Sequence, residues 1–130
     1  MSPRRSAEVT WPTDAELNIL QVLWERGACT VREVHETLYG NDGAGYTTAL
    51  KLMQIMFEKG IVIRDDSNKT HIYQPNVTRE KTQRHMVGKM IDTLFSGSSA
   101  QLVMQALGNS KASKQELDDI QRMLDDLKKQ

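Results

Sequence analysis

The sequence has very little of what extracellular and membrane proteins require. Cys29 is the single cysteine among 130 residues, so neither a disulfide nor a multi-thiolate metal site can form within one chain. No apolar run approaches the ~18 residues that a membrane-spanning helix needs. The residues around Arg4 and Arg5 lack the apolar segment of a signal peptide. We therefore expect a protein of the reducing cytoplasm.

The chain also lacks an excess of charge of either sign, since 17 Lys and Arg residues balance 17 Asp and Glu residues. A net charge of zero counts against a protein that binds nucleic acid by charge alone. The balance is uneven along the chain, however. Residues 59–89 hold seven basic and three acidic residues, whereas residues 91–130 hold five basic and six acidic ones. Any basic face must therefore lie in the first two-thirds of the chain.

Helix-initiating patterns divide the chain. Capping boxes of the form Ser/Thr-x-x-Glu start at Thr13, Thr30 and Ser113, each before an apolar-periodic run. They predict helices over 14–26 and 31–39 and a final helix after residue 113. A further amphipathic segment, 46–59, lies between two glycines and predicts a third helix after a glycine-rich loop, "GNDGAG", at 40–45.

The hydrophobic period changes after Gly60. The stretch "IVIRDDSNKTHIYQP" has β-branched runs on both sides of a polar turn, which predicts a β-hairpin. From Thr78 onward the pattern is helical again. The order of elements predicts a mostly α fold with a small β-hairpin: a winged helix-turn-helix domain over 1–77, followed by a helical dimerisation domain over 78–130.

In a winged helix-turn-helix domain the last of the three helices presents its outer face to the major groove of DNA. Thr, Lys and Gln side chains can pair with base edges, and a wing can contact phosphates. The residues we expect to bind DNA are Tyr46, Thr47, Thr48, Lys51 and Gln54 of the helix and Arg64, Lys69 and His71 of the hairpin. An N-terminal arm carrying Arg4 and Arg5 could add contacts, or could be a disordered tail. Two other readings stay open, a solvated helix face and a winged domain that binds protein as an adaptor.

The helices of the last fifty residues are strongly apolar on one side and too short to form a core of their own. They could pack back onto the winged domain or against a second copy, and we expect a homodimer because DNA readers of this size use two half-sites. The predicted dimerisation residues are Met90, Leu94, Phe95, Leu102, Val103, Leu117, Ile120, Leu124 and Leu127.

No residue pattern indicates an enzyme. His35, His71 and His85 fall in three different elements without a partner at metal-binding spacing, and the paired aspartates lie in a turn and on an outer helix face. We therefore predict no catalytic residue, no metal, no cofactor and no small-molecule substrate.

Four stretches together resemble the penicillinase-repressor family, winged-helix transcriptional repressors of the BlaI/MecI/CopY type. They are "TDAELNILQVLWERGACTVREVHETL", "YTTALKLMQIMFEKGIVIRD", "THIYQP" and "LFSGSSAQLVMQAL". The resemblance implies a homodimeric transcriptional repressor that binds a palindromic operator in double-stranded DNA. In antibiotic-responsive members it also implies a membrane-bound metallopeptidase antirepressor as partner, with cleavage in the C-terminal part, near Gln105 and Ala106.

The sequence departs from the family in three places. Thr47, Leu50 and Ile55 stand where the lactam-responsive members carry basic residues, so the operator sequence does not transfer. The side chains of Gln105 and Ala106 differ from those at the family's scissile bond. The C-terminal part has no cysteine, so copper sensing by thiolates, as in the copper-responsive members of the family, is excluded.

Overall fold

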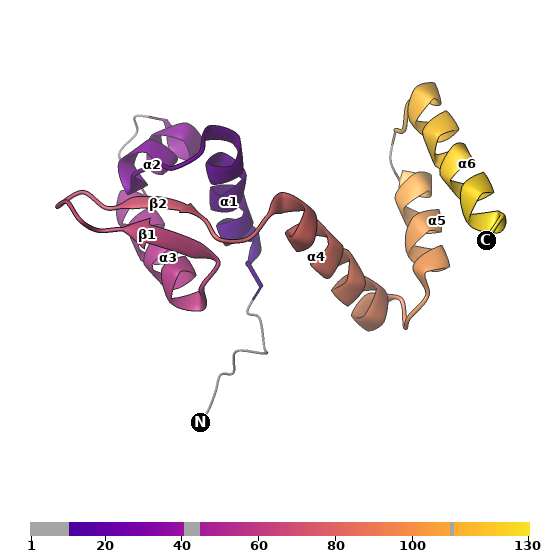
Figure 1. The fold of residues 1–130 in the computed structure, drawn as a ribbon, viewed down its shortest axis with the longest axis horizontal. Coiled ribbons are helices and arrows are strands. Elements are labelled where there is room, and N and C mark those ends of the chain that lie inside the picture. The colour runs from indigo at the N-terminus through magenta and orange to yellow at the C-terminus, as the bar shows by residue number, and fades with distance from the viewer. Residues whose placement is uncertain (1–10, 41–44, 110) are drawn as a thin grey trace. The chain divides into compact units, whose positions relative to one another are not determined.

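The computed structural model describes residues 11–40, 45–109 and 111–130, and its two compact units meet between Met86 and Val87. The predicted helices and the hairpin are all present (Figure 1). Arg4, Arg5 and residues 41–44 of the predicted loop lie outside the described residues. The elements are α1 (Asp14–Arg26), α2 (Val31–Tyr39), α3 (Tyr46–Lys59), β1 (Val62–Asp65), β2 (Ile72–Pro75), α4 (Arg79–Leu94), α5 (Ser99–Asn109) and α6 (Lys114–Lys128).

All three predicted capping boxes form. At the start of α1, the Glu16 amide donates to Thr13 Oγ1 over 3.2 Å, and the Thr13 amide donates to Glu16 Oε1 over 3.0 Å. The same reciprocal pair begins α2 and α6. Helix α3 begins differently, after Gly45 with φ 85° and without a side-chain cap. Glycine adopts this left-handed backbone without strain, so the chain can turn sharply into α3.

The hairpin is a two-stranded antiparallel sheet in which Arg64 lies opposite Tyr73. Cys29 extends it by one bridge, since its amide donates to the Tyr73 carbonyl over 2.9 Å and its carbonyl accepts from the Tyr73 amide over 2.8 Å. Strand β2 is therefore held between β1 and the segment that joins α1 to α2, and the hairpin tip projects away from α1 (Figure 1).

The core of the first unit lies between α1, α2, α3 and the hairpin. Its buried apolar residues are Ile19, Leu20, Val22, Leu23, Cys29, Val31, Val34, Ala49, Met53, Met56, Ile61, Val62 and Tyr73. The apolar periodicity of the three helices predicts five more residues on the buried side that are only partly covered. Phe57 is 37% exposed, and four others pack at the edge of this core: Leu17, Trp24, Leu38 and Leu52. Phe57 lies at the rim, where an arginine of the hairpin covers part of its ring.

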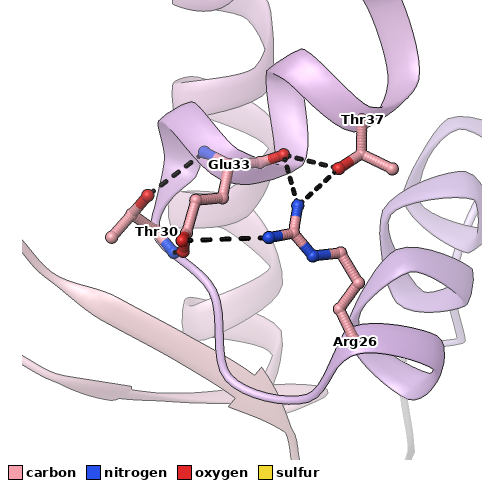
Figure 2. A network of polar contacts seen from close by, with 4 residues as sticks. All are labelled: Arg26, Thr30, Glu33 and Thr37. Atoms are coloured by element: carbon pink, nitrogen blue, oxygen red, sulfur yellow. Dashed lines mark hydrogen bonds and ion pairs between the residues drawn. The ribbon is translucent and has the colours of Figure 1, made fainter.

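A polar network fixes α2 against the end of α1 (Figure 2). Arg26 Nη1 donates to Thr37 Oγ1 over 2.7 Å and to the Glu33 carbonyl over 3.4 Å. Its other terminal nitrogen lies 3.9 Å from Glu33 Oε2, and that carboxylate also accepts from the Thr30 amide through Oε1. One arginine thus joins the C-terminal turn of α1 to the first two turns of α2.

The first turns of α4 belong to the first unit. Trp24 Nε1 donates to the Val77 carbonyl over 3.0 Å, and Arg79 pairs with Glu25 over 3.1 Å. Thr82 is buried, and His85 stacks on Trp11 with ring centroids 3.5 Å apart. The packed unit therefore extends past residue 77 to Met86, while the functional division at 77/78 stays a prediction.

Candidate nucleic-acid interface

Helix α3 has the two faces that its sequence predicts. Ala49, Met53 and Met56 are buried in the core, and the opposite stripe is solvent-exposed. That stripe holds Thr47, Thr48, Lys51 and Gln54. A shallow groove runs along it between Thr47 and Glu58. The stripe offers hydroxyls, one ammonium group and one amide, which are groups that can pair with base edges.

A cleft of about 560 Å³ separates α3 from the first turn of α2 and from the hairpin. It brings together four of the predicted site residues, Tyr46, Gln54, Lys69 and His71. Thr47, Thr48, Lys51 and Arg64 do not line it. Gln54 borders both this cleft and the groove along α3.

The cleft also contains residues that sequence reasoning did not single out, above all Arg32, with Thr30 and Thr70 beside it. The Arg32 guanidinium lies over the Tyr46 ring, 5.4 Å from its centroid. The signal in the sequence was position, since Arg32 is in the first turn of α2, the helix that precedes α3. The sequence alone does not distinguish this exposed arginine from other surface charges, because its contact with Tyr46 appears only in the folded chain.

The structure gives Arg64 two partners within the protein. Its guanidinium lies over the Phe57 ring of α3, 4.0 Å from the centroid, and its Nη2 is 3.5 Å from Asp66 Oδ2. Its Nε is buried and lacks a hydrogen-bond partner among the described residues. These contacts hold the base of the hairpin against α3. A phosphate would have to compete with Asp66 for this arginine.

The tip of the hairpin is polar and exposed from Asp65 to Thr70. The amide and hydroxyl of Ser67 both donate to Asp65 Oδ1, over 3.0 and 2.7 Å, and these bonds lower the pKa of the Asp65 carboxyl below its ordinary value. The Asp65 carboxylate is therefore occupied within the turn. Lys69, also at this tip, lines the cleft.

A buried ion pair connects the C-terminal end of α3 to α1. Lys59 Nζ lies 2.6 Å from Glu16 Oε1, and the Glu16 side chain is 2% exposed. The same oxygen caps the start of α1. The last turn of α3 is thus tied to the first turn of α1, which fixes how far α3 extends from the core.

The predicted dimerisation residues lie in the second unit. Helices α5 and α6 contain no buried residue over the described positions 99–109 and 114–128. Among the nine predicted residues, Phe95, Leu102 and Ile120 are half-buried and the other six are exposed. Gln105 and Ala106 are exposed inside α5, so the peptide bond between them is helical.

The described residues contain neither a candidate metal site nor a membrane-spanning helix. No group of three or more His, Cys, Asp or Glu side chains in 11–40, 45–109 and 111–130 is placed to hold a metal ion. Over the same ranges, no helix has the length and apolar character needed to cross a membrane.

The helix order, the hairpin and the exposed stripe on α3 define a winged helix-turn-helix protein with a helical C-terminal part. Its sequence matches the model of the penicillinase repressor family over residues 12–126. The chain therefore belongs to the penicillinase repressor family.

The individual relatives are similar to this chain at low sequence identity. The transcriptional regulator BlaI of Mycobacterium tuberculosis is 32% identical over 89 residues, which cover 68% of this chain and 62% of that protein. The penicillinase repressor of Bacillus licheniformis is 20% identical over 116 residues, covering 89% of this chain and 91% of the relative. A solution structure of the DNA-binding domain of the repressor BlaI aligns with 55% of this chain and 88% of its own length, at 21% identity and a TM-score of 0.49.

Proposed function

We propose that this protein is a transcriptional repressor that binds a palindromic operator in double-stranded DNA as a homodimer. The observation that carries the proposal is the exposed stripe of Thr47, Lys51 and Gln54 on α3, beside a cleft lined with basic residues. Membership of the penicillinase repressor family and the names of its relatives support it. The proposal includes a cytoplasmic location, where operator DNA is found.

In this proposal α3 lies in the major groove. Tyr46, Thr47, Thr48, Lys51 and Gln54 contact bases or the phosphates next to them. Lys69 and His71 of the hairpin contact the backbone, and Arg64 does so once its guanidinium leaves Asp66. The winged domain over 1–77 supplies these contacts, and residues 78–130 supply the dimer interface.

A selection from a pool of random duplexes tests base reading. The repressor should enrich two inverted half-sites, with centres about one helical turn or a multiple of it apart. Gln54→Ala should lose the preference at one base pair per half-site, by about 1–3 kcal/mol, because a paired amide is removed from the groove. Enrichment of nothing, or an unchanged preference in Gln54→Ala, would show that this face does not read DNA.

The apolar stripe of α6, exposed except at the half-buried Ile120, supports dimerisation by a second copy. Leu117, Ile120, Leu124 and Leu127 recur at three- and four-residue steps along its length. Covering such a stripe with an identical stripe satisfies both copies at once. Sedimentation should give two protomers, and Leu124→Asp should give one. Gln115→Asp, on the polar side of the same helix, is the matched control and should stay dimeric.

The proposal for release from DNA involves a membrane-bound metallopeptidase-type partner and cleavage near Gln105 and Ala106. Its support is family membership and the exposure of both residues on α5. Since the bond lies inside a helix, α5 must unwind locally before a protease can cut it. Mass spectrometry of the repressor from cells treated with a β-lactam should find a fragment that ends at Gln105, and an intact chain would count against cleavage.

The adaptor reading has one observation in its favour. Ile63 and Ile72 lie on the outer face of the hairpin and are both solvent-exposed, as in surfaces that bind protein. Failure of every duplex in the selection to bind would favour this alternative.

A further inference from the structure

The cleft between α2, α3 and the hairpin concentrates positive charge in a chain whose net charge is zero. Its basic lining residues are Arg32, Lys69 and His71, and none of the described residues that line it carries a carboxylate. The carboxylates near it are engaged elsewhere, Glu33 with Arg26 and the Thr30 amide, and Asp65 with Ser67. The cleft is therefore a site for an anion.

Arg32 differs in its partners from three other arginines of the first unit. Arg26, Arg64 and Arg79 each pair with a carboxylate. No carboxylate of the described residues pairs with Arg32, whose guanidinium instead lies over the Tyr46 ring at 5.4 Å. An aromatic face orients a guanidinium while leaving its N–H groups at the edge available to a ligand.

The position of the cleft indicates which anion it takes. Leu50 and Gln54 line both the cleft and the groove along α3. If α3 lies in a major groove, the backbone strand bordering that groove runs past Gln54 into the cleft. A phosphate there would meet α2 on one side and the hairpin tip on the other.

We infer that the cleft holds one backbone phosphate of the bound duplex, with Arg32 oriented by Tyr46 on one side and Lys69 on the other. The inference rests on the proposed function and adds to it a contact from α2, an element outside both the base-reading helix and the wing. Arg32 then contributes affinity at every sequence, whereas Gln54 contributes discrimination.

Neutral substitutions on both molecules test the contact. The full-length protein and its Arg32→Gln variant are titrated with the selected operator and with operators carrying one uncharged methylphosphonate at each backbone position in turn. The wild type should lose affinity at each phosphate that the protein contacts, and one of these positions per half-site should be the phosphate in the cleft. Arg32→Gln should bind the unmodified operator about tenfold more weakly, and modification at the cleft position should cost it less affinity than it costs the wild type, because only Lys69 still contacts that phosphate.

Salt dependence gives a second readout. Each phosphate contact contributes about 0.9 to the slope of log affinity against log salt, so losing one contact per protomer lowers the slope of a dimer by about 1.8. Arg84→Gln is the matched control, since Arg84 is exposed on α4 and does not line the cleft. Its affinity and slope should equal those of the wild type.

The outcomes separate the inference from the proposed function. An unchanged slope in Arg32→Gln, or an undiminished methylphosphonate effect in that variant, would overturn the inference while leaving the repressor proposal intact. Equal binding of the wild type to operator and scrambled duplex, with a reduced slope in Arg32→Gln on both, would refute sequence-specific repression and still support the phosphate contact. Absence of binding to any duplex would overturn both.

Discussion

Among the single contacts of the winged domain, the ion pair between Lys59 and Glu16 should be the one whose loss lowers the free energy of unfolding most. Glu16 Oε1 accepts from Lys59 Nζ over 2.6 Å and from the Thr13 amide over 3.0 Å, and its side chain is 2% exposed. The Lys59 side chain is 20% exposed and so retains access to water. The two partners therefore differ in what happens when the other is removed.

This difference sets the magnitudes. Lys59→Met leaves a buried carboxylate with one backbone donor, and removing one partner of a buried pair costs about 3–5 kcal/mol. Since Lys59 is partly solvated, we expect the lower part of that range, about 3 kcal/mol. Glu16→Gln keeps an acceptor for the Thr13 amide, and Lys59 can turn toward water, so its cost should be about 1–2 kcal/mol. The double variant should cost less than the sum of the two.

Urea unfolding of the full-length protein measures all three variants. Fluorescence reports on the winged domain, because both tryptophans, Trp11 and Trp24, belong to the first unit. Lys51→Met is the matched control: it makes the same substitution on the same helix at an exposed position, and it should change the free energy of unfolding by less than about 0.5 kcal/mol. Equal costs for Lys59→Met and Lys51→Met would refute the reasoning, as would a larger cost for Glu16→Gln than for Lys59→Met.

Three further predictions concern the wing, the thiol and the domain boundary. Asp66→Asn should raise DNA affinity a few-fold and steepen its salt dependence, because it removes an acid from the wing and frees Arg64; weaker binding in a gel-shift titration would contradict this. Burial raises the pKa of the Cys29 thiol above its ordinary value, against the opposing effect of Arg26. As pH rises, the thiol therefore loses its proton in the unfolded state before it does so in the folded state. The stability that the neutral thiol contributes is complete below the ordinary thiol pKa and falls as pH rises past it. Urea titrations from pH 8 to 10 should show this fall in the wild type and less of it in Cys29→Ala. A chain ending at residue 77 should melt below one ending at residue 86, because it lacks buried Thr82 and the stack of His85 on Trp11; equal melting temperatures would place the boundary at 77.

Local signals in the sequence were sufficient for most of the fold. Each Ser/Thr-x-x-Glu box encodes its own hydrogen bonds within four residues, so the starts of α1, α2 and α6 could be read directly. The change from a helical to an alternating period predicted the hairpin for the same reason. The exposed stripe of α3 followed from periodicity alone.

Features that depend on contacts between distant segments could not be read in this way. Phe57 has the periodicity of a core residue, yet it lies at the rim of the core, in contact with Arg64 of the hairpin. The sequence also does not reveal that Phe57 and Asp66 engage Arg64, whose phosphate contact stays a prediction. Arg32 is not among the residues that the sequence predicts to bind DNA, because only the folded chain places it beside Tyr46 and across from the hairpin. Burial of Glu16 was also unforeseen, because its capping role gave no sign of its partner Lys59, 43 residues away.

A binding titration tests the central claim most directly. The full-length protein is titrated against the duplex upstream of its own coding region and against a scrambled duplex, from about 50 to 200 mM salt, with the mass of the complex measured at saturation. The account predicts two protomers on the upstream duplex, a steep salt slope, and much weaker binding to the scrambled one. Equal affinity for the two duplexes, or one protomer per site, would contradict the claim that this chain is a dimeric repressor that reads a palindrome.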